Sequence, residues 1–317
     1  MEPGLLALYI ILGLIGTAVF MYFSLTFMIS VIIYRILFVR TNKEKWSRHV
    51  SWNDEELKKM FADGEEWGRK YDSSRRTVSI TSDGLKLIGE YFDFGYDKAV
   101  IIVPGRSESG TYSYYFAEPY RKSGFNVLAI DNRCHGLSEG RYNTIGVKEY
   151  HDLLNWSKYL HDEEKVESII FHGICIGSST AIIALTREDC PSYLKGMVAE
   201  GTYTTFKAIF DKQLQRRNKP TFPHTAEILG LISLTAGHSI YKYSPIKLVD
   251  KIKVPVLFLY SKKDTLALPE KSMELFDKIQ SEKRLVWFDK GEHSHIRINN
   301  TEKYDSSIEE FLKDYFA

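Results

Sequence analysis

This chain contains little cysteine, and its positive and negative charges are nearly equal in number. Both features limit the classes of protein to which the chain can belong. The 317 residues contain three cysteines, Cys134, Cys175 and Cys190. Their odd number and irregular spacing indicate neither a disulfide framework nor a zinc site. The chain has 42 Lys and Arg against 41 Asp and Glu, a formal net charge of +1. This balance gives no indication of a nucleic-acid partner, which would favour a strongly basic surface.

The chain also lacks internal repeats, low-complexity segments, clusters of metal-ligating side chains and a glycine-rich phosphate-binding loop. We therefore expect no metal ion and no organic cofactor. The length fits one large α/β domain with an additional segment. Aromatic residues make up 14% of the chain, enough to supply a large core.

The N-terminal segment differs in character from the rest of the chain. No charged residue occurs from Leu5 to Tyr34. A helix needs about 20 apolar residues to cross a bilayer, so this run is long enough to span it with tilt. A cleaved signal peptide would have a basic start and a shorter apolar core, whereas this chain starts Met1-Glu2-Pro3. We predict an uncleaved transmembrane anchor over residues 1–40.

Positive charge follows the apolar run and predicts its orientation. The basic residues there are Arg35, Arg40, Lys43, Lys45 and Arg48. Because Lys and Arg remain on the cytoplasmic side, we expect a single-pass protein of the cell membrane with its large domain in the cytoplasm. Trp46 and Trp52 follow, either at the headgroup level or packed on the domain. Residues 41–74 are expected to connect membrane and domain through a helix over about 53–70.

From residue 75 onward, strand patterns alternate with helix patterns. Eight strand-like segments cover residues 77–81, 85–94, 99–103, 125–130, 167–172, 194–199, 254–260 and 284–288. Helical patterns cover about 112–123, 144–160, 178–186 and 302–316. This alternation predicts an α/β fold with a mostly parallel eight-stranded sheet and helices on both faces.

The segment 202–253 interrupts this alternation. It separates two strands by far more than a usual crossover does. It is either a long crossover with extra helices or a small helical cap over a binding site. We favour the cap, since long connections in compact domains are usually functional. The expected domain therefore covers residues 75–317 with a cap insertion at about 202–253.

The string Gly173-Ile174-Cys175-Ile176-Gly177 lies between a strand-like and a helix-like run. A strand, a sharp turn carrying a nucleophile between glycines, and then a helix form the arrangement called the nucleophile elbow. The glycines relieve crowding around the strained nucleophile. Serine is usual at the centre, but this chain has Cys175, whose thiol is intrinsically the stronger nucleophile. The alternative is an inert buried thiol, since free cysteine is often buried.

Five motifs in this order resemble the α/β-hydrolase superfamily, and within it membrane-anchored bacterial hydrolases of the serine-hydrolase type. They are Val103-Pro104-Gly105-Arg106, Asp131-Asn132-Arg133-Cys134-His135-Gly136-Leu137-Ser138, the Gly173 to Gly177 elbow, Ser261-Lys262-Lys263-Asp264 and Gly291-Glu292-His293. The chain order of nucleophile, acid and histidine is typical of that superfamily. The resemblance covers about residues 75–317 and implies the α/β-hydrolase fold.

The resemblance also implies a catalytic triad. Cys175 matches the nucleophile, as in the dienelactone-hydrolase branch, which uses cysteine in the same fold. His293 matches the general base, and Asp264 matches the acid that orients the histidine and stabilises its charged form. The alternatives are His295 as the base and Asp289 or Asp250 as the acid.

An oxyanion hole needs two backbone N–H groups aimed at the developing negative charge. The resemblance assigns these to Ile176, directly after the nucleophile, and to Arg106 in the loop after the third strand. Pro104-Gly105 stands where the superfamily often has His-Gly, so a structural histidine is missing there. Three further residues match a motif that mainly braces loops near the site, and we interpret them as structural: Asp131, Arg133 and His135.

Together these residues predict the hydrolysis of a small ester or thioester through an acyl-enzyme, without a metal or cofactor. A lipidic acyl substrate would fit the anchor. One alternative is an acyltransferase of the same fold, and another is a catalytically silent, membrane-tethered binding protein. Retention of Asp264 and His293 argues against the silent protein. The sequence leaves open whether Cys175 is the natural nucleophile or replaces a serine, an exchange used to trap acyl-enzymes.

Overall fold

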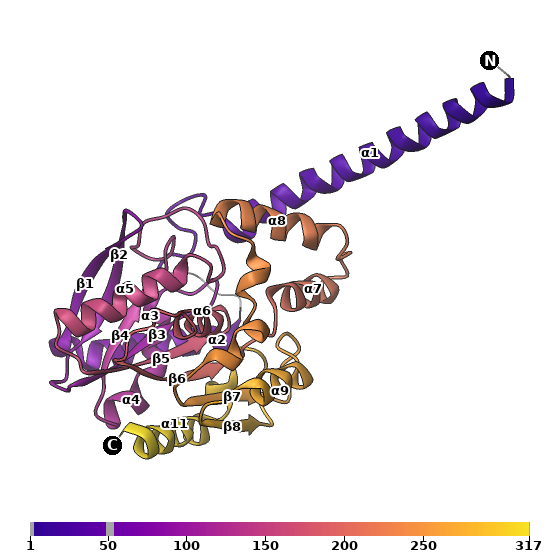
Figure 1. The fold of residues 1–317 in the computed structure, drawn as a ribbon. Helices are drawn as coiled ribbons and strands as arrows, with labels where there is room; N and C mark the ends of the chain where they lie inside the picture. The colour runs from indigo at the N-terminus through magenta and orange to yellow at the C-terminus, as the bar shows by residue number, and fades with distance from the viewer. Residues whose placement is uncertain (1–2, 49–53, 317) are drawn as a thin grey trace.

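The computed structural model describes residues 3–48 and 54–316. Figure 1 shows a layered body from which one long helix, α1, projects. The eight strands are β1 Arg75–Ser82, β2 Leu85–Phe92, β3 Lys98–Val103, β4 Asn126–Ile130, β5 Ser168–Ile174, β6 Leu194–Glu200, β7 Val256–Ser261 and β8 Lys283–Phe288. The helices are α1 Pro3–Phe38, α2 Glu55–Lys70, α3 Gly110–Ser113, α4 Glu118–Lys122, α5 Glu149–Asp162, α6 Ile176–Leu185, α7 Phe206–Arg216, α8 His224–Ala236, α9 Pro269–Lys278, α10 Ile296–Asn299 and α11 Thr301–Phe316.

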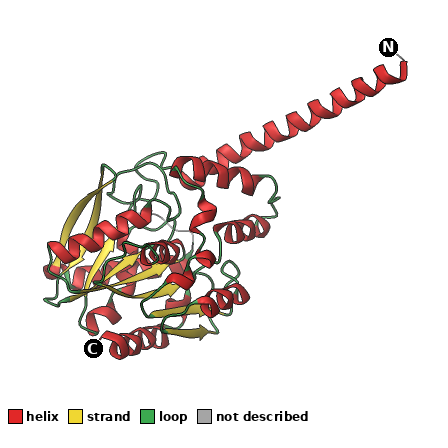
Figure 2. Cartoon of the chain, in the orientation of Figure 1, coloured by secondary structure: helices red, strands yellow, loops and turns green. Residues whose placement is uncertain are grey.

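The strands form one sheet in the order β1-β2-β4-β3-β5-β6-β7-β8. The pairs β1–β2 and β2–β4 are antiparallel, and the remaining five pairs are parallel. The central strands are buried along their whole length because helices cover both sides, which explains their continuous apolar runs. Figure 2 shows this sheet between helices, so the predicted α/β fold with an eight-stranded, mostly parallel sheet is confirmed.

Two cores fill the space between the sheet and its helices. One lies under α5, α6 and α9 and includes Trp156, Ile182 and Leu275. The other lies under α2, α4 and α11 and includes Met60 and Phe311. Helix α2 lies in the segment expected to connect membrane and domain, yet Met60 on α2 is fully buried in this second core. The connecting segment therefore contributes a helix to the body itself.

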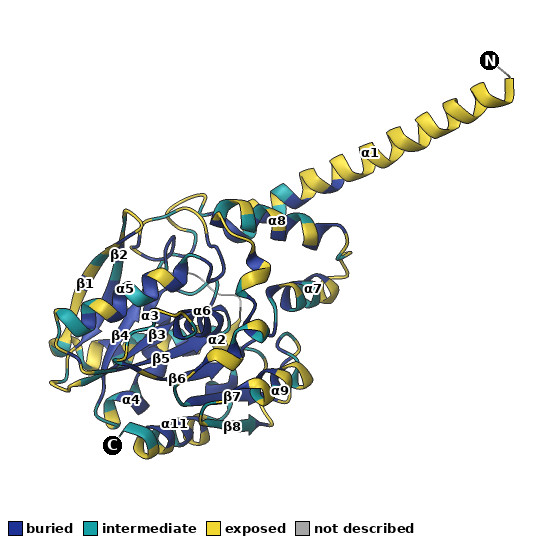
Figure 3. Ribbon diagram, in the orientation of Figure 1, coloured by how far each residue is buried: buried dark blue, intermediate teal, exposed yellow. Residues whose placement is uncertain are grey.

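Helix α1 is exposed along its outer part and packed against the body at its inner end (Figure 3). Its buried residues are Thr26, Ser30, Tyr34 and Phe38, which recur every four positions and therefore line one face. The ammonium group of Lys45 donates to the carbonyl oxygens of Ile36 and Val39 at the helix end. A cation there satisfies carbonyl groups that the helix leaves unpaired.

The segment between β6 and β7, expected to form a cap, folds into helices α7 and α8 followed by short 3₁₀ helices. These helices and the inner end of α1 share a third apolar cluster, which also touches Cys175. Phe38 of α1 contacts Phe206 and Phe210 of α7, with ring centroids 5.8 and 6.2 Å apart. The inner end of α1 is thus packed into the cap.

Three helices have other bounds in the structure than the sequence predicted, two of them in the body and one in the connecting segment. The helix expected over 112–123 is broken into α3, a 3₁₀ turn and α4, with Pro119 in the first turn of α4, where proline is tolerated. The helix expected from residue 144 begins at Glu149, whose carboxylate accepts the backbone N–H groups of Thr144 and Gly146 and holds 144–148 in a loop.

In the connecting segment, Asp54 caps α2 by accepting the backbone N–H of Leu57, so the helix begins slightly later than expected. Trp52 and residue 53 lie outside the described residues. Trp46 is buried and stacks on His135, with ring centroids 4.5 Å apart. Of the two positions considered for Trp46, the structure therefore has the one on the domain.

Candidate active site

Cys175 lies at the sharp turn between β5 and α6. Its backbone has φ 54° and ψ −110°, a conformation that is strained for any residue with a side chain. The Cys175 N–H donates to the carbonyl oxygen of Glu200 at 2.9 Å, which ties the turn to the neighbouring strand β6. The thiol is half-buried and faces a pocket at the carboxyl ends of the parallel strands. Open α/β sheets bind ligands at this edge.

The two elbow glycines are required by space. A Cβ atom on Gly173 would lie 2.4 Å from the backbone of Ser178, and one on Gly177 would lie 2.0 Å from the carbonyl oxygen of Val103. Neither approach is possible for a real side chain, and in both cases the obstacle is backbone. The spacing of the glycines around Cys175 therefore follows from the close packing of the turn against β3 and the start of α6.

His293 and Asp264 lie beside this turn and are joined by a hydrogen bond. The Nδ1 atom of His293 lies 2.7 Å from Oδ2 of Asp264. The other carboxylate oxygen of Asp264 accepts the backbone N–H groups of Leu266 and Ala267, both at 2.8 Å. The Asp264 side chain is 1% exposed and that of His293 is 11% exposed. The aspartate is thus fixed by its own loop and in turn fixes the histidine ring.

The other ring nitrogen of His293, Nε2, is buried and has no hydrogen-bond partner among the described residues. Burial by itself lowers the pKa of His293, but the neighbouring Cys175 thiol and the Asp264 carboxylate together raise it well above its ordinary value. The surroundings of His293 therefore favour its protonated, imidazolium form. Catalytic hydrogen bonds are often loose without substrate, which agrees with the free Nε2.

The expected oxyanion-hole residues line the same pocket as Cys175 and His293. Within the described part of the chain, the backbone N–H groups of Arg106 and Ile176 have no backbone carbonyl as acceptor. Both N–H groups therefore remain available to a ligand. The Arg106 carbonyl oxygen lies 2.7 Å from Nε2 of His135, and its guanidinium donates to the carbonyl oxygen of Leu37 at the end of α1. The loop is thus held from both sides.

The motif interpreted as structural makes bracing contacts. The Asp131 carboxylate accepts the backbone N–H groups of Gly110 and Leu137 and pairs with Arg48. Arg133 forms a buried ion pair with Asp152, and each of these side chains is 5% exposed. The superfamily often has a histidine directly before the glycine, at the position of Pro104. In this chain His135 holds the same loop through its contact with the Arg106 carbonyl oxygen.

The alternative base and acids lie elsewhere. The Nδ1 atom of His295 lies 2.8 Å from the carbonyl oxygen of His293, and its Nε2 faces Asp54 at 3.5 Å. Asp289 is 76% exposed and pairs with Lys262. Asp250 lines a separate surface groove. Of the histidines and carboxylates considered from the sequence, His293 and Asp264 are therefore the pair that the fold brings to Cys175.

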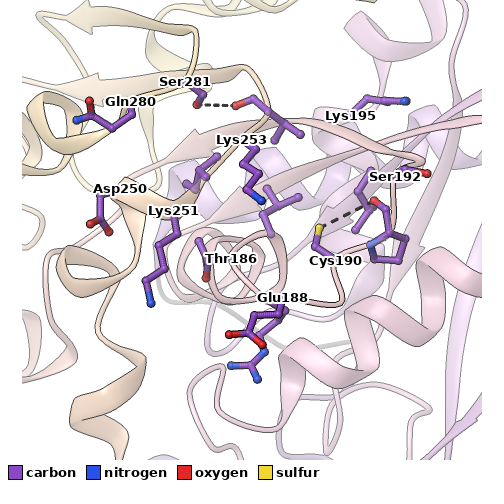
Figure 4. Close-up of a pocket in the computed structure, with 16 residues that line it drawn as sticks. Thr186, Glu188, Cys190, Ser192, Lys195, Asp250, Lys251, Lys253, Gln280 and Ser281 are labelled. Atoms are coloured by element: carbon purple, nitrogen blue, oxygen red, sulfur yellow. Dashed lines mark hydrogen bonds between the residues drawn. The ribbon is translucent and has the colours of Figure 1, made fainter.

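The pocket at Cys175 is small, about 110 Å³, and lies between the sheet edge and the cap. Its cap side is formed by Phe206, Ile209 and Gln213 of α7. A larger groove of about 800 Å³ lies elsewhere (Figure 4), lined by residues such as Cys190, Lys251 and Ser281. Neither Cys175 nor His293 lines that groove, so its larger volume does not make it the candidate active site.

Three functional neighbours were not predicted from the sequence. Glu200 is fully buried at the end of β6, and burial raises its pKa to about 7. Gly201 leaves room for the histidine, because a Cβ there would lie 3.1 Å from Cε1 of His293. The carboxyl group of Glu108 lines the pocket, and burial raises its pKa despite the nearby Arg106. A Glu-Gly pair directly after a buried strand is the signal that would have indicated the first two.

Comparison with known proteins agrees with the fold described above. A family model described as the α/β-hydrolase fold matches residues 98–226. The uncharacterized protein YqkD of Bacillus subtilis (strain 168) is 28% identical over 219 residues, which cover 67% of this chain and 70% of that protein. The esterase Pf2001 of Pyrococcus furiosus is similar in structure with a TM-score of 0.66 at 26% identity, covering 79% of this chain and 94% of the esterase. An α/β-hydrolase from Vibrio vulnificus gives a TM-score of 0.60 at 16% identity, covering 87% of this chain and 91% of that structure.

The sheet order, the strained elbow and these matches together define the class of protein. The chain has the α/β-hydrolase fold and is similar to members of that superfamily. At 16% identity the Vibrio vulnificus structure supports the fold alone. The esterase structure, at higher identity, supports hydrolase as the class of activity.

Proposed function

We propose that this protein hydrolyses an ester or thioester through a Cys175–His293–Asp264 triad. The observation that carries the proposal is the shared position of all three groups. The Asp264 carboxylate lies 2.7 Å from Nδ1 of His293. Among the described residues, Nε2 of the same ring has no hydrogen-bond partner, and the ring lines the pocket that the Cys175 thiol also lines. A nucleophile, a base and a group that orients the base are the parts that acyl transfer requires.

The reaction begins when the Cys175 thiolate attacks the carbonyl carbon and a C–S bond forms. Negative charge moves to the carbonyl oxygen, where the N–H groups of Arg106 and Ile176 are placed to receive it. The tetrahedral intermediate collapses, the bond to the leaving group breaks, and His293 gives its Nε2 proton to that group. The acyl group is then bound to Cys175 as a thioester.

Water completes the cycle. His293, now neutral, accepts a proton from water as the oxygen attacks the thioester carbonyl. Collapse of the second intermediate breaks the C–S bond, releases the carboxylic acid and restores the thiolate beside the imidazolium. Asp264 holds the ring in the orientation that both steps need.

We also propose that α1 is retained as a membrane anchor. The helix has 36 residues and is long and apolar enough to cross a membrane. Its inner end supports retention over cleavage, since Phe38 is fully buried against the cap and Arg106 donates to Leu37. Removal of α1 would expose the cap interior. The basic residues after the helix favour a cytoplasmic hydrolase domain.

The orientation has its own test. Protease added to intact cells should leave residues 75–317 uncut, and the same protease should digest them after the membrane is permeabilised. Digestion in intact cells would place the domain outside and contradict the assignment made from charge.

The activity is tested with the full-length protein in detergent and a panel of acyl esters and acyl thioesters of increasing chain length. Turnover should be present and should be lost in Cys175→Ala but kept in Cys190→Ala, the matched control. Turnover that persists in Cys175→Ala would defeat the mechanism. Labelling of Cys175 by iodoacetamide without turnover of any substrate would favour a silent relative.

Acyl transfer is the second candidate, and it shares the same acyl-enzyme. A primary amine or an alcohol added to the assay distinguishes the two. Hydrolysis predicts that free acid remains the main product, whereas transfer predicts a new amide or ester in proportion to the added acceptor.

A further inference from the structure

Helix α8 of the cap has an unusual exposed face. The positions turned to solvent are Ala226, Gly230 and Leu234, spaced four residues apart on one face. Leu234 is 78% exposed, and Phe222, just before the helix, is 68% exposed. A surface helix of a soluble domain normally carries charged residues on its outer face. The exposed face of α8 carries none, so water is a poor partner for it.

Three polar residues of α8, His224, Glu227 and Thr235, contact α1. Both carboxylate oxygens of Glu227 accept hydrogen bonds from α1, one from Thr26 at 3.1 Å and the other from Ser30 at 2.6 Å. The Ser30 hydroxyl also lies 2.7 Å from Nδ1 of His224. This inversion, with polar groups inside and apolar groups outside, is typical of helices in contact with lipid.

Helix α8 packs beside the inner part of the charge-free run of α1. Tyr34 donates to Thr235 near the domain, and Phe23 meets Phe222 further out, with ring centroids 6.3 Å apart. At about 1.5 Å per residue the run from Leu5 to Tyr34 is about 45 Å long, whereas the hydrocarbon core is about 30 Å thick. The part of α1 beside α8 therefore lies at the membrane boundary if α1 spans the bilayer.

The apolar surface of α1 continues at this level. On the sides that α8 leaves open, Met28 is 56%, Ile32 is 52% and Ile36 is 61% exposed. Ile32 and Ile36 lie nearer the domain, beside Arg35 and Lys45. Further out, Phe222 joins the exposed face of α8 to the apolar surface of α1 through Phe23, which is itself 43% exposed. An exposed apolar surface of this kind marks an interaction site.

We propose that the outer face of α8, together with Phe222, rests in the lipid interface of the membrane that α1 crosses. The exposed face of α8 is continuous with the exposed apolar surface of α1. Lipid around the inner part of α1 would therefore also contact Leu234, and this argues for lipid as the occupant. Helix α7 of the same cap lines the Cys175 pocket through Phe206 and Ile209. Resting on the proposed hydrolase function, this placement assigns the substrate to acyl esters or thioesters that reside in the bilayer.

The contact with lipid is tested directly by fluorescence quenching. The full-length Leu234→Trp variant is reconstituted into phosphatidylcholine vesicles with and without brominated acyl chains. Relative to the unsubstituted protein, its added fluorescence should fall by about twofold or more in brominated lipid, since interfacial side chains lie within about 5–10 Å of the acyl boundary. Tyr96→Trp is the control, because Tyr96 is 40% exposed just before β3, at the opposite end of the sheet. Equal fluorescence of Leu234→Trp in both lipids overturns the proposal.

The substrate class is tested with Leu234→Asp in the same vesicles. Turnover of a long-chain ester dissolved in the bilayer should fall about tenfold, since a carboxylate disfavours insertion of the cap surface. Turnover of a short, water-soluble ester should remain unchanged, as it should for both esters in Tyr96→Asp. An equal loss for both esters would overturn the assignment to bilayer substrates.

Two further outcomes separate the claims. If neither ester is turned over by the unsubstituted protein, the proposed function fails while the quenching measurement still decides the lipid contact. If Leu234→Trp is unquenched and Leu234→Asp converts a dimer into a monomer, the occupant is a second copy of the chain, and the proposal is wrong.

Discussion

The two sides of the Cys175 pocket are built in different ways. On the sheet side, the chemical groups are held by hydrogen bonds to backbone: Cys175 N–H to Glu200, and the Asp264 carboxylate to the loop that follows it. On the cap side, Phe206 and Ile209 of α7 are held by apolar packing that includes Phe38 of α1. The sheet side fixes the positions of the Cys175 and Asp264 side chains, whereas the cap side depends on the packing of α1.

The two sides of the pocket are therefore expected to have different roles, the sheet side in the reaction and the cap side in the entry of substrate. Main-chain bonds to buried groups hold a strained turn such as that of Cys175, where the strain is about 1–3 kcal/mol. Apolar packing between helices is adjustable, and caps belong to the parts of a protein that open most easily. We therefore expect changes on the sheet side to affect kcat and changes on the cap side to affect stability and substrate entry.

The largest expected effect comes from removing the base on the sheet side. His293→Ala should lower kcat/KM by at least about 10³-fold, since it removes both the proton transfer and the partner of the thiolate. His295→Ala, two residues away and turned toward Asp54, is the matched control and should change kcat/KM by less than about threefold. Steady-state kinetics of both variants on one ester measures this. A larger loss in His295→Ala would reassign the base.

The next effect comes from the group that orients the base. Asp264→Asn should lower kcat by about 10²–10⁴-fold with little change in KM, because the ring loses its charged partner and its preferred tautomer. Asp289→Asn is the control, since Asp289 is 76% exposed and pairs with Lys262 at the surface. The measurement is kcat and KM of both variants on the same ester. Similar losses of kcat in Asp264→Asn and Asp289→Asn would contradict the role assigned to Asp264.

On the cap side, Phe38→Ala should destabilise the packing of α1 against α7 by about 3–5 kcal/mol, the usual range for a large buried ring. Phe38 is fully buried, whereas Ile36, two residues earlier, is 61% exposed and provides the control Ile36→Ala. Limited proteolysis of the cap in detergent measures the opening. The cap of Phe38→Ala should be cut many times faster than that of Ile36→Ala, and equal rates would show that α1 does not hold the cap.

Beneath the site, Glu200 should make stability depend on pH. Burial raises its pKa from 4.5 to about 7, so the folded protein binds this proton more tightly than the unfolded chain does. The stabilisation is complete below pH 4.5 and is lost as pH rises through 7, a change of about 3 kcal/mol.

Unfolding midpoints at pH 5 and pH 8 measure this contribution. Glu200→Gln should reduce the difference between the two midpoints, whereas Glu282→Gln, at an exposed position, should leave it as in the unsubstituted protein. The same pH difference in all three proteins would show that Glu200 is not the group responsible.

The smallest effect is expected where the two sides meet at the surface. Arg216 of α7 lies 3.5 Å from Glu292 beside the histidine, with their side chains 49% and 62% exposed. An exposed pair of this kind contributes about 0–1 kcal/mol. Arg216→Ala should therefore change KM by less than about fivefold and leave kcat unchanged. A large fall in kcat would mean that the cap acts on the chemistry itself.

The sheet and the elbow could be predicted from the sequence because their signals are local. Continuous apolar runs indicate buried parallel strands, and the glycines around Cys175 follow from backbone crowding that any such turn has. The choice between His293 and His295 needed the tertiary structure, since both follow the last strand. Glu200 was missed because a carboxylate before a glycine also fits an ordinary solvated turn.

The inner part of α1 shows why the rest could not be predicted. Thr26, Ser30 and Tyr34 interrupt the apolar run every four residues, a spacing that indicates a packed face. Hydropathy alone treats them as tolerated polar residues in a spanning helix. Their partner, α8, lies about two hundred residues away, as the sequence separation of 201 between Thr26 and Glu227 shows. No local pattern indicates such a contact.

One measurement tests the triad most directly. The full-length protein is mixed with an acyl thioester, quenched with acid within the first turnovers, and analysed by peptide mass spectrometry. An acyl group is expected on the peptide that contains Cys175. It should be absent from the peptides of Cys134 and Cys190 and absent in Cys175→Ala. Burial raises the pKa of the Cys134 and Cys190 thiols, which disfavours their thiolates. Sustained turnover with no acyl group on Cys175, or turnover retained in Cys175→Ala, would contradict the triad.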